Sequence, residues 1–228
     1  MKISSNCSNF DLPSWLASYF ENTRRRFATL QQAIKADHAN RAGDAKKEIE
    51  FALKQEKIVD VILNALAKKK IPERITHNDT KFNNVMLDVV TGKAMCVVDL
   101  DTVMPGSALY DFGDMVRTTT SPTLEDELDL AKVQMRMPMF KSLARGYLES
   151  AGSFLTKGER ALIAFSGKLI TFTIGIRFLT DYLSGDTYFR VHRAHHNLDR
   201  ARTQFKLVES IERQEDAMQK FVNGVTFA

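Results

Sequence analysis

One short segment rich in β-branched residues interrupts a chain whose apolar residues otherwise follow a helical period. Between about residues 12 and 70, apolar residues recur close to i, i+3, i+4 and i+7, and a turn is expected at 39–44. Helical patterning returns near 124–150, with a disturbance at Pro138, and again over 156–183 and 190–221. The sequence therefore predicts an α+β fold that is mostly α, in which a helical body surrounds one small β element.

That β element is predicted to be a hairpin. Its strands are the short runs 85–88 and 94–99, and the residues between them include Gly92, which suits a tight turn. Polar residues flank the hairpin on both sides: His77, Asp79, Lys81, Asn84, Asp99 and Asp101. Because a hairpin brings the start of its first strand next to the end of its second, Asn84 and Asp99 are expected to converge.

These residue types in this order suit phosphoryl transfer. The segment 77–84 fits H-x-D-x-x-x-x-N, the spacing of a kinase catalytic loop. Asp79 can accept the proton of an attacking hydroxyl, and Lys81 can neutralise charge on the transferring phosphoryl group. Asn84 and Asp99 offer the amide and carboxylate oxygens that hold Mg²⁺.

Each residue also has a structural interpretation. Asp79 alone could cap a helix, the two asparagines before the hairpin could form a turn, and Asp99 and Asp101 could be solvated strand-end residues. The ordered set around a hairpin favours a site. The string DFG at 111–113 follows no predicted strand, so Asp111 is expected to cap a helix that begins near Phe112 or to hydrogen-bond the catalytic loop from behind.

Three strings carry a resemblance to a known family: THNDTKFNNVMLD at 76–88, VVDLDTVMPG at 97–106 and YDFGDMVR at 110–117. Together they resemble the aminoglycoside phosphotransferase/choline kinase superfamily, which has a protein-kinase-like fold. RFLTDYLSGD at 177–186 and HNLDRARTQ at 196–204 are similar to its N-acetylhexosamine 1-kinase branch. The resemblance runs from about residue 15 to residue 215.

The resemblance implies a role for each matching residue. It makes Asp79 the catalytic base, with Lys81 beside it, and Asn84 and Asp99 ligands of Mg²⁺. Asp101 matches an acidic position that also lies at the metal site in choline-kinase-like members, and His77 supports the loop. Arg177 matches a sugar-contacting position, whereas its spacing from Asp181 also allows a surface salt bridge.

The resemblance also implies what the chain lacks. Members of the family place a nucleotide-binding lobe before this region, with a phosphate-covering loop and a lysine for the α- and β-phosphates. No G-x-G-x-x-G and no V-A-I-K-like strand occurs in this sequence. The whole chain, 1–228, is therefore interpreted as one kinase-like C-terminal lobe, with a helical part (1–75), a catalytic loop and metal hairpin (76–117) and a helical substrate-binding part (118–228).

The charge and composition of the chain indicate which classes of binding partner to expect. The net charge is only +4 and the basic residues are dispersed, which gives no support to nucleic-acid binding. The N-terminus has no secretory pattern, the apolar stretch 161–176 is interrupted by Lys168, and the two cysteines have no metal or disulfide spacing. We expect a cytoplasmic protein without a membrane span, and the exposed lobe interface could mediate self-association.

Two classes of function follow. The first is an ATP- and Mg²⁺-dependent kinase lobe that phosphorylates a hydroxyl of a small molecule, preferably an N-acetylhexosamine or a related sugar or amino sugar; a choline or aminoglycoside kinase is the alternative within this class. The second is a truncated kinase-like module that binds a ligand without turnover. In either case the missing lobe is expected to be encoded separately or lost, and the chain alone to be inactive or weakly active.

Overall fold

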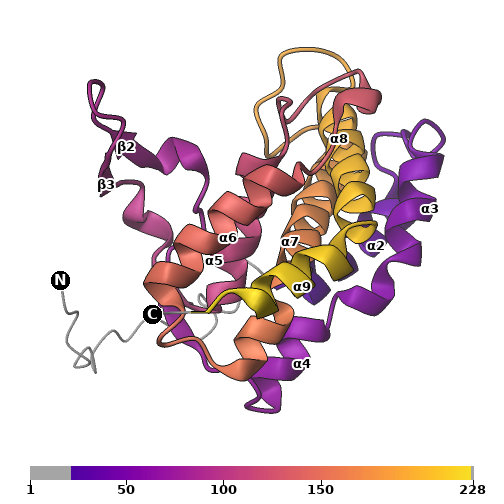
Figure 1. Ribbon diagram of the computed structural model, residues 1–228. Helices are drawn as coiled ribbons and strands as arrows, with labels where there is room; N and C mark the ends of the chain where they lie inside the picture. The colour runs from indigo at the N-terminus through magenta and orange to yellow at the C-terminus, as the bar shows by residue number, and fades with distance from the viewer. Residues whose placement is uncertain (1–21, 227–228) are drawn as a thin grey trace.

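The computed structural model describes residues 22–226 and shows a helical body from which one hairpin projects (Figure 1). Eight α-helices and four short strands lie within these residues. The helices are α2 (Thr23–Ala36), α3 (Lys46–Lys54), α4 (Val61–Ala67), α5 (Ala108–Thr120), α6 (Met137–Ala151), α7 (Lys157–Leu183), α8 (His196–Glu212) and α9 (Glu215–Gly224). The strands are β1 (Arg74–Thr76), β2 (Val85–Leu87), β3 (Ala94–Val97) and β4 (Met104–Gly106). The predicted fold class, mostly α with a small β part, is confirmed.

Helix α7 forms the centre of the body, and α2, α5, α8 and α9 pack around it. It begins at a capping box in which Thr156 and Glu159 each bond the other's backbone N–H, as helix starts often do. Its Phe172 ring lies 6.5 Å from the ring of Phe27 on α2 and 6.2 Å from that of Phe205 on α8. These buried aromatic contacts fix both neighbouring helices against α7.

By length and hydropathy α7 could cross a membrane, contrary to the expectation from its interrupting polar residues. Within the fold, however, 78% of its most apolar stretch is buried against other helices. A central core helix passes the same test of length and hydropathy, so the apolar character of α7 is accounted for by its position.

A glycine sets how closely α5 approaches α7. A Cβ atom at Gly113 would lie 2.5 Å from the backbone oxygen of Ser166, a distance that no side chain tolerates. Only glycine therefore allows this contact between the two helices. Because the same helix carries Asp111, the close packing also fixes the position of the loop that Asp111 binds.

Helix boundaries differ from the predicted ones at two places. The interval 124–150 contains only a short 3-10 turn at Leu130–Lys132 before α6 begins at Met137, with Pro138 in its first turn, where a missing N–H costs nothing. The interval 190–221 contains two helices, α8 and α9, which are separated at Arg213 and Gln214. The helix over 156–183 and the turn at 39–44 are confirmed; the start of the first predicted helix, up to residue 21, lies outside the described residues.

The strands form two separate antiparallel pairs. β2 and β3 make the predicted hairpin, with Val85 opposite Val97 and Gly92 in the turn at a φ of +65°. β1 pairs with β4, with Arg74 opposite Gly106. The pairing of β1 with β4 was not predicted, and β4 ends shortly before Asp111, so the expectation that DFG follows no strand was wrong.

Candidate active site

The loop between β1 and β2 carries the residues predicted to do chemistry. Asn78, which directly precedes Asp79, adopts a left-handed conformation with a φ of +63°. Its side-chain amide donates to the backbone oxygens of Thr76, at 3.2 Å, and Thr102, at 3.0 Å. Asparagine tolerates this backbone region because its short amide can bond locally, and here the two bonds hold the turn that presents Asp79.

Asp111 hydrogen-bonds the catalytic loop from behind, which was one of the two roles predicted for it. Its carboxylate accepts the backbone N–H of His77 at 2.9 Å and of Asn78 at 2.7 Å. Burial raises the pKa of Asp111 above its usual value, and the two N–H bonds oppose that rise. The alternative role as a helix cap is wrong, because Ser107 caps α5 and Asp111 lies in its first turn.

His77 connects the loop to the end of the hairpin. Its Nδ1 accepts the N–H of Asp79 at 3.3 Å, and its Nε2 lies 3.0 Å from the backbone oxygen of Val98. Each ring nitrogen thus has a backbone partner, one in the catalytic loop and one at the end of the hairpin. His77 thus positions Asp79 and the strand that leads to Asp99.

Four predicted residues form one cluster: Asp79, Lys81, Asn84 and Asp99. Lys81 Nζ lies 2.7 Å and Asn84 Nδ2 lies 2.9 Å from Asp79 Oδ2. Asp99 Oδ2 is 3.4 Å from Asn84 Nδ2 and 3.8 Å from Lys81 Nζ. Desolvation alone would raise the pKa of Asp79, but hydrogen bonds from Lys81 and Asn84, with the charges of Lys81 and Arg117, hold it below its usual range. The carboxylate is therefore ionised at neutral pH and able to accept a proton.

The donors of Asn84 and Asp99 suit Mg²⁺. Asp99 lies just after β3 in a left-handed conformation, with a φ of +62°, and its carboxylate is about half exposed. Asn84 Nδ2 lies 3.4 Å from Asp99 Oδ2, so the two side chains are adjacent, as ligands of one Mg²⁺ ion must be. Asn84 turns its Nδ2 toward Asp99, so binding an ion would require its amide to rotate and present Oδ1.

Asp101, the third predicted metal ligand, is not joined to Asn84 or Asp99 in the described residues. Asp101 is exposed on a single helical turn, Leu100–Thr102, and no hydrogen bond or ion pair with Asn84 or Asp99 links it within residues 22–226. The same residues hold no cluster of three His, Cys, Asp or Glu side chains able to bind a metal. A metal-binding role for Asp101 stays a prediction.

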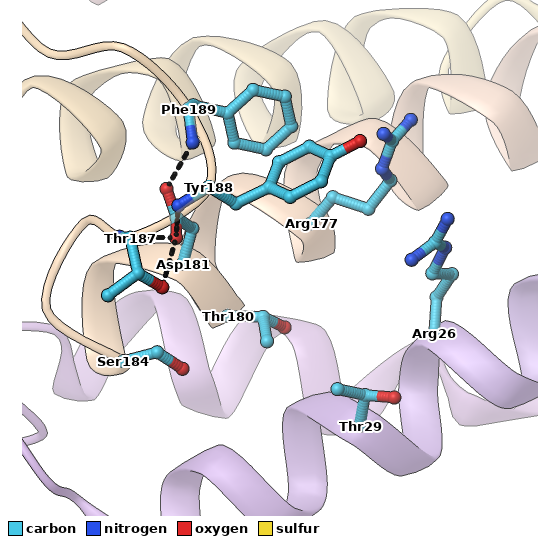
Figure 2. A pocket seen from close by; sticks show the side chains of 9 residues that line it. All are labelled: Arg26, Thr29, Arg177, Thr180, Asp181, Ser184, Thr187, Tyr188 and Phe189. Atoms are coloured by element: carbon cyan, nitrogen blue, oxygen red, sulfur yellow. Dashed lines mark hydrogen bonds between the residues drawn. The ribbon is translucent and has the colours of Figure 1, made fainter.

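Arg177 lines a separate cavity of 190 Å³ between α2, α7 and the loop after α7 (Figure 2). The cavity is bordered by Arg26 and Arg177, by the rings of Tyr188 and Phe189, and by hydroxyl groups. The Arg177 guanidinium lies 5.5 Å from the Phe189 ring and 6.0 Å from the Tyr188 ring. Figure 2 shows the Arg26 and Arg177 side chains reaching toward the same space from two helices.

Asp181 is not the surface partner that its spacing from Arg177 suggested. It is buried, and its carboxylate accepts the backbone N–H groups of Thr187, Tyr188 and Phe189 at 2.8–2.9 Å (Figure 2). Asn197 of α8 donates to it as well, at 2.9 Å. Asp181 therefore folds the loop back onto α7 and holds the two aromatic rings at the cavity.

A second cavity, of 270 Å³, borders the catalytic loop itself. It lies between that loop, the end of α5, residues 121–125 and α8, and Lys81, Arg117 and Gln204 are among its lining residues. Sequence reasoning missed Arg117 and Gln204. Each is the last residue of a string that carries the resemblance, YDFGDMVR at 110–117 and HNLDRARTQ at 196–204, but no role was assigned to it, and only the packing of α8 brings Gln204 to the loop.

A family model for phosphotransferase enzymes matches residues 11–151, well over half of the chain. The matched range contains the whole catalytic loop, the hairpin and α5. The chain belongs to the phosphotransferase enzyme family. Membership confirms the predicted superfamily and makes this protein a transferase of the kinase type. Kinases of this family use ATP and typically Mg²⁺, in agreement with the donor set at Asn84 and Asp99.

Proposed function

We propose that this phosphotransferase transfers the γ-phosphoryl group of Mg²⁺-ATP to a hydroxyl of a small molecule, preferably an N-acetylhexosamine. The observation that carries the proposal is the Asp79 carboxylate, held between Lys81 and Asn84 with Asp99 adjacent. Phosphoryl transfer demands little covalent chemistry from the protein and depends on positioning and charge. This cluster supplies both.

Each residue has a defined task in that reaction. Asp79 orients the acceptor hydroxyl and takes its proton as the oxygen attacks phosphorus. Lys81, whose ammonium lies between the two carboxylates, balances negative charge on the phosphoryl oxygens. Asn84 and Asp99 would hold Mg²⁺, which neutralises phosphate charge when bound. His77, Asn78 and Asp111 keep the loop in this arrangement.

The sugar preference is supported by the cavity at Arg177. Planar guanidinium donors suit hydroxyl and N-acetyl oxygens, and aromatic rings such as Tyr188 suit the apolar face of a sugar. The hydrogen bonds from the loop after α7 to Asp181 hold the Tyr188 and Phe189 rings beside Arg177. This arrangement favours a binding role for Arg177 over a structural one.

Arg177→Ala is expected to raise KM for N-acetylglucosamine about 10-fold with little change in kcat, because it removes binding donors and leaves the transfer cluster intact. Steady-state kinetics of the variant beside Arg213→Ala, which removes an exposed arginine at the end of α8, measures this. An unchanged KM for every sugar tested would contradict the assignment and return Arg177 to a structural role.

The exposed side chains of the hairpin support a proposal about where the nucleotide binds. Its apolar side chains Met86, Val89, Val90 and Met95 are all exposed, and Val89 is 100% exposed. A group of large apolar side chains exposed on one short element suits a face that binds a ligand or a partner. It supports the proposal that this face adjoins the nucleotide and a further lobe, and that copies of the chain self-associate through it.

The 228-residue chain alone is therefore expected to bind Mg²⁺-ATP weakly and to turn over slowly. Calorimetric titration with Mg²⁺-ATP, together with a turnover assay on N-acetylglucosamine, choline and kanamycin, tests this and the choice of acceptor. Micromolar affinity with turnover of about 1 s⁻¹ or more, the ordinary enzyme range, would show that the chain is a complete kinase. Ligand binding with no transfer, even at high enzyme concentration, would favour the non-catalytic module.

A further inference from the structure

The cavity at Arg177 has two walls that come from segments far apart in the sequence. Helix α2 provides Arg26 and Thr29, and the loop after α7, residues 184–189, provides the rings of Tyr188 and Phe189. Figure 2 shows Arg26 and Thr29 on one helix and Tyr188 on the loop across the cavity. The position of this loop relative to α2 therefore sets the width of the cavity.

A buried amide fixes the middle of the loop. Asp186 has a left-handed backbone, with a φ of +60°, and its carboxylate accepts Asn197 Nδ2 at 2.9 Å. The same amide nitrogen donates to the Asp181 carboxylate, also at 2.9 Å, and Asn197 is completely buried. An amide nitrogen has two N–H donors, so Asn197 serves both carboxylates at once. It thereby joins the loop to α7.

Arg41 connects this loop to the end of α2. Its Nη1 donates to the Asp186 carboxylate at 2.5 Å and to the backbone oxygen of Tyr182 at 3.0 Å, and its guanidinium lies 4.8 Å from the Tyr182 ring. The backbone N–H of Arg41 donates to the carboxylate of Asp37, the residue at which α2 ends, at 2.8 Å. Arg41 therefore links the two walls of the cavity, although it does not line the cavity itself.

We propose that Arg41 is a positioning residue for the acceptor: by holding Asp186, it keeps the loop and its Tyr188 and Phe189 rings at the distance from α2 that the sugar requires. The inference rests on the proposed role of the Arg177 cavity as the sugar-binding site. Charge-assisted hydrogen bonds are the stronger ones, and this pair is partly shielded from water, with side-chain exposures of 32% and 12%. The Arg41 side chain acts through the loop and makes no contact with the sugar.

The test compares Arg41→Gln with a matched control, Arg202→Gln. Arg202 binds Glu48 at 2.7 Å, and the exposures of that pair, 36% and 12%, are nearly those of Arg41 and Asp186. The control pair joins α8 to α3 and does not line the Arg177 cavity. Both substitutions should lower the melting temperature by similar amounts, whereas only Arg41→Gln should alter sugar binding.

Affinity for N-acetylglucosamine is measured by ligand-observed NMR titration of the full chain, and KM and kcat by steady-state kinetics. Arg41→Gln should weaken binding and raise KM about 10-fold, with little change in kcat, because the loop shifts while the transfer cluster stays intact. Arg202→Gln should change neither the affinity nor KM. A purely structural role for Arg41 would lower stability without this split between KM and kcat.

Two further variants test the contact itself. Asp186→Asn removes the carboxylate charge, while asparagine tolerates the left-handed backbone and can still accept the Asn197 bond. It should weaken sugar binding as much as Arg41→Gln, and the double variant should lose no more than either single one, since both remove the same interaction. Arg41→Lys keeps the charge and should recover part of the affinity.

Unchanged affinity in Arg41→Gln, or an equal loss of affinity in Arg202→Gln, would overturn the inference. The absence of sugar binding to the wild type would overturn both it and the role of the Arg177 cavity. The proposed transfer reaction fails by a different measurement, the absence of any Asp79-dependent phosphorylation. Arg41-dependent sugar binding without such phosphorylation would retain the inference and reject the kinase, and Asp79-dependent phosphorylation with a KM indifferent to Arg41 would do the reverse.

Discussion

Asp79→Asn is expected to lower the rate of phosphoryl transfer by about 100- to 10 000-fold, the usual contribution of a positioned acid–base group. The amide can still accept one hydrogen bond and fills the same space, but it can neither take the hydroxyl proton nor balance the charge of Lys81. Single-turnover measurements with enzyme in excess over ATP resolve the rate even when the wild-type chain is slow. Circular dichroism and the melting temperature should remain close to those of the wild type.

The matched control is Asp88→Asn, which changes an exposed carboxylate in the hairpin turn. Asp88 accepts the N–H groups of Val90 and Thr91, and asparagine can make the same bonds. The control should therefore transfer phosphate at the wild-type rate. Near-full activity of Asp79→Asn would reassign the base, and loss of activity in both variants would attribute the effect to the hairpin rather than to the loop.

Asp99→Ala is expected to lower the transfer rate at limiting Mg²⁺ by about 100-fold or more. Removing a residue that only supports a metal ligand already costs about 10- to 100-fold, and Asp99 is proposed to bind the ion itself. Titration of activity with Mg²⁺ and with Mn²⁺ should show a higher midpoint and partial recovery at high concentration. Substituting the exposed Asp216 on α9 by Asn should leave the titration unchanged.

Comparison with Asp101→Ala separates the two acidic positions. Asp99 lies 3.4 Å from Asn84, whereas no described contact joins Asp101 to either residue. The Asp99 variant should therefore have the larger effect on the metal midpoint. Equal effects would mean that Asp101 reaches the ion when it is bound, as the family resemblance implies. An Mg²⁺ titration that neither substitution alters would place the metal site elsewhere.

Local chemistry explains what the sequence could predict. The hairpin followed from two β-branched runs and a glycine, and the helix over 156–183 from apolar residues at helical spacing. The convergence of Asn84 and Asp99 followed from the hairpin alone. In each case the residues that determine the structure lie within a few positions of it or directly across a tight turn.

The features that were missed depend on packing between distant segments. β1 pairs with β4 across the hairpin, and the strand signal of MPG at 104–106 is too weak to predict. Pro138 can disturb a helix or begin one, and only the neighbouring structure decides between them. Gln204 reaches the catalytic loop because α8 packs on α7. No spacing within α8 could indicate that contact.

The hairpin has a mechanical consequence for the metal site. Asn84 immediately precedes β2 and Asp99 follows β3, and Val98 N–H donates to the backbone oxygen of Asn84 at 2.9 Å. The pairing of the two strands therefore sets the distance between Asn84 and Asp99, which carry the donor atoms. A slip of one residue in strand pairing would displace Asp99 along Asn84 by about 3.3 Å and turn alternate side chains over. Lengthening the distal turn at Gly92 leaves that separation unchanged, whereas one residue more or less within either strand changes the spacing on which an ion depends.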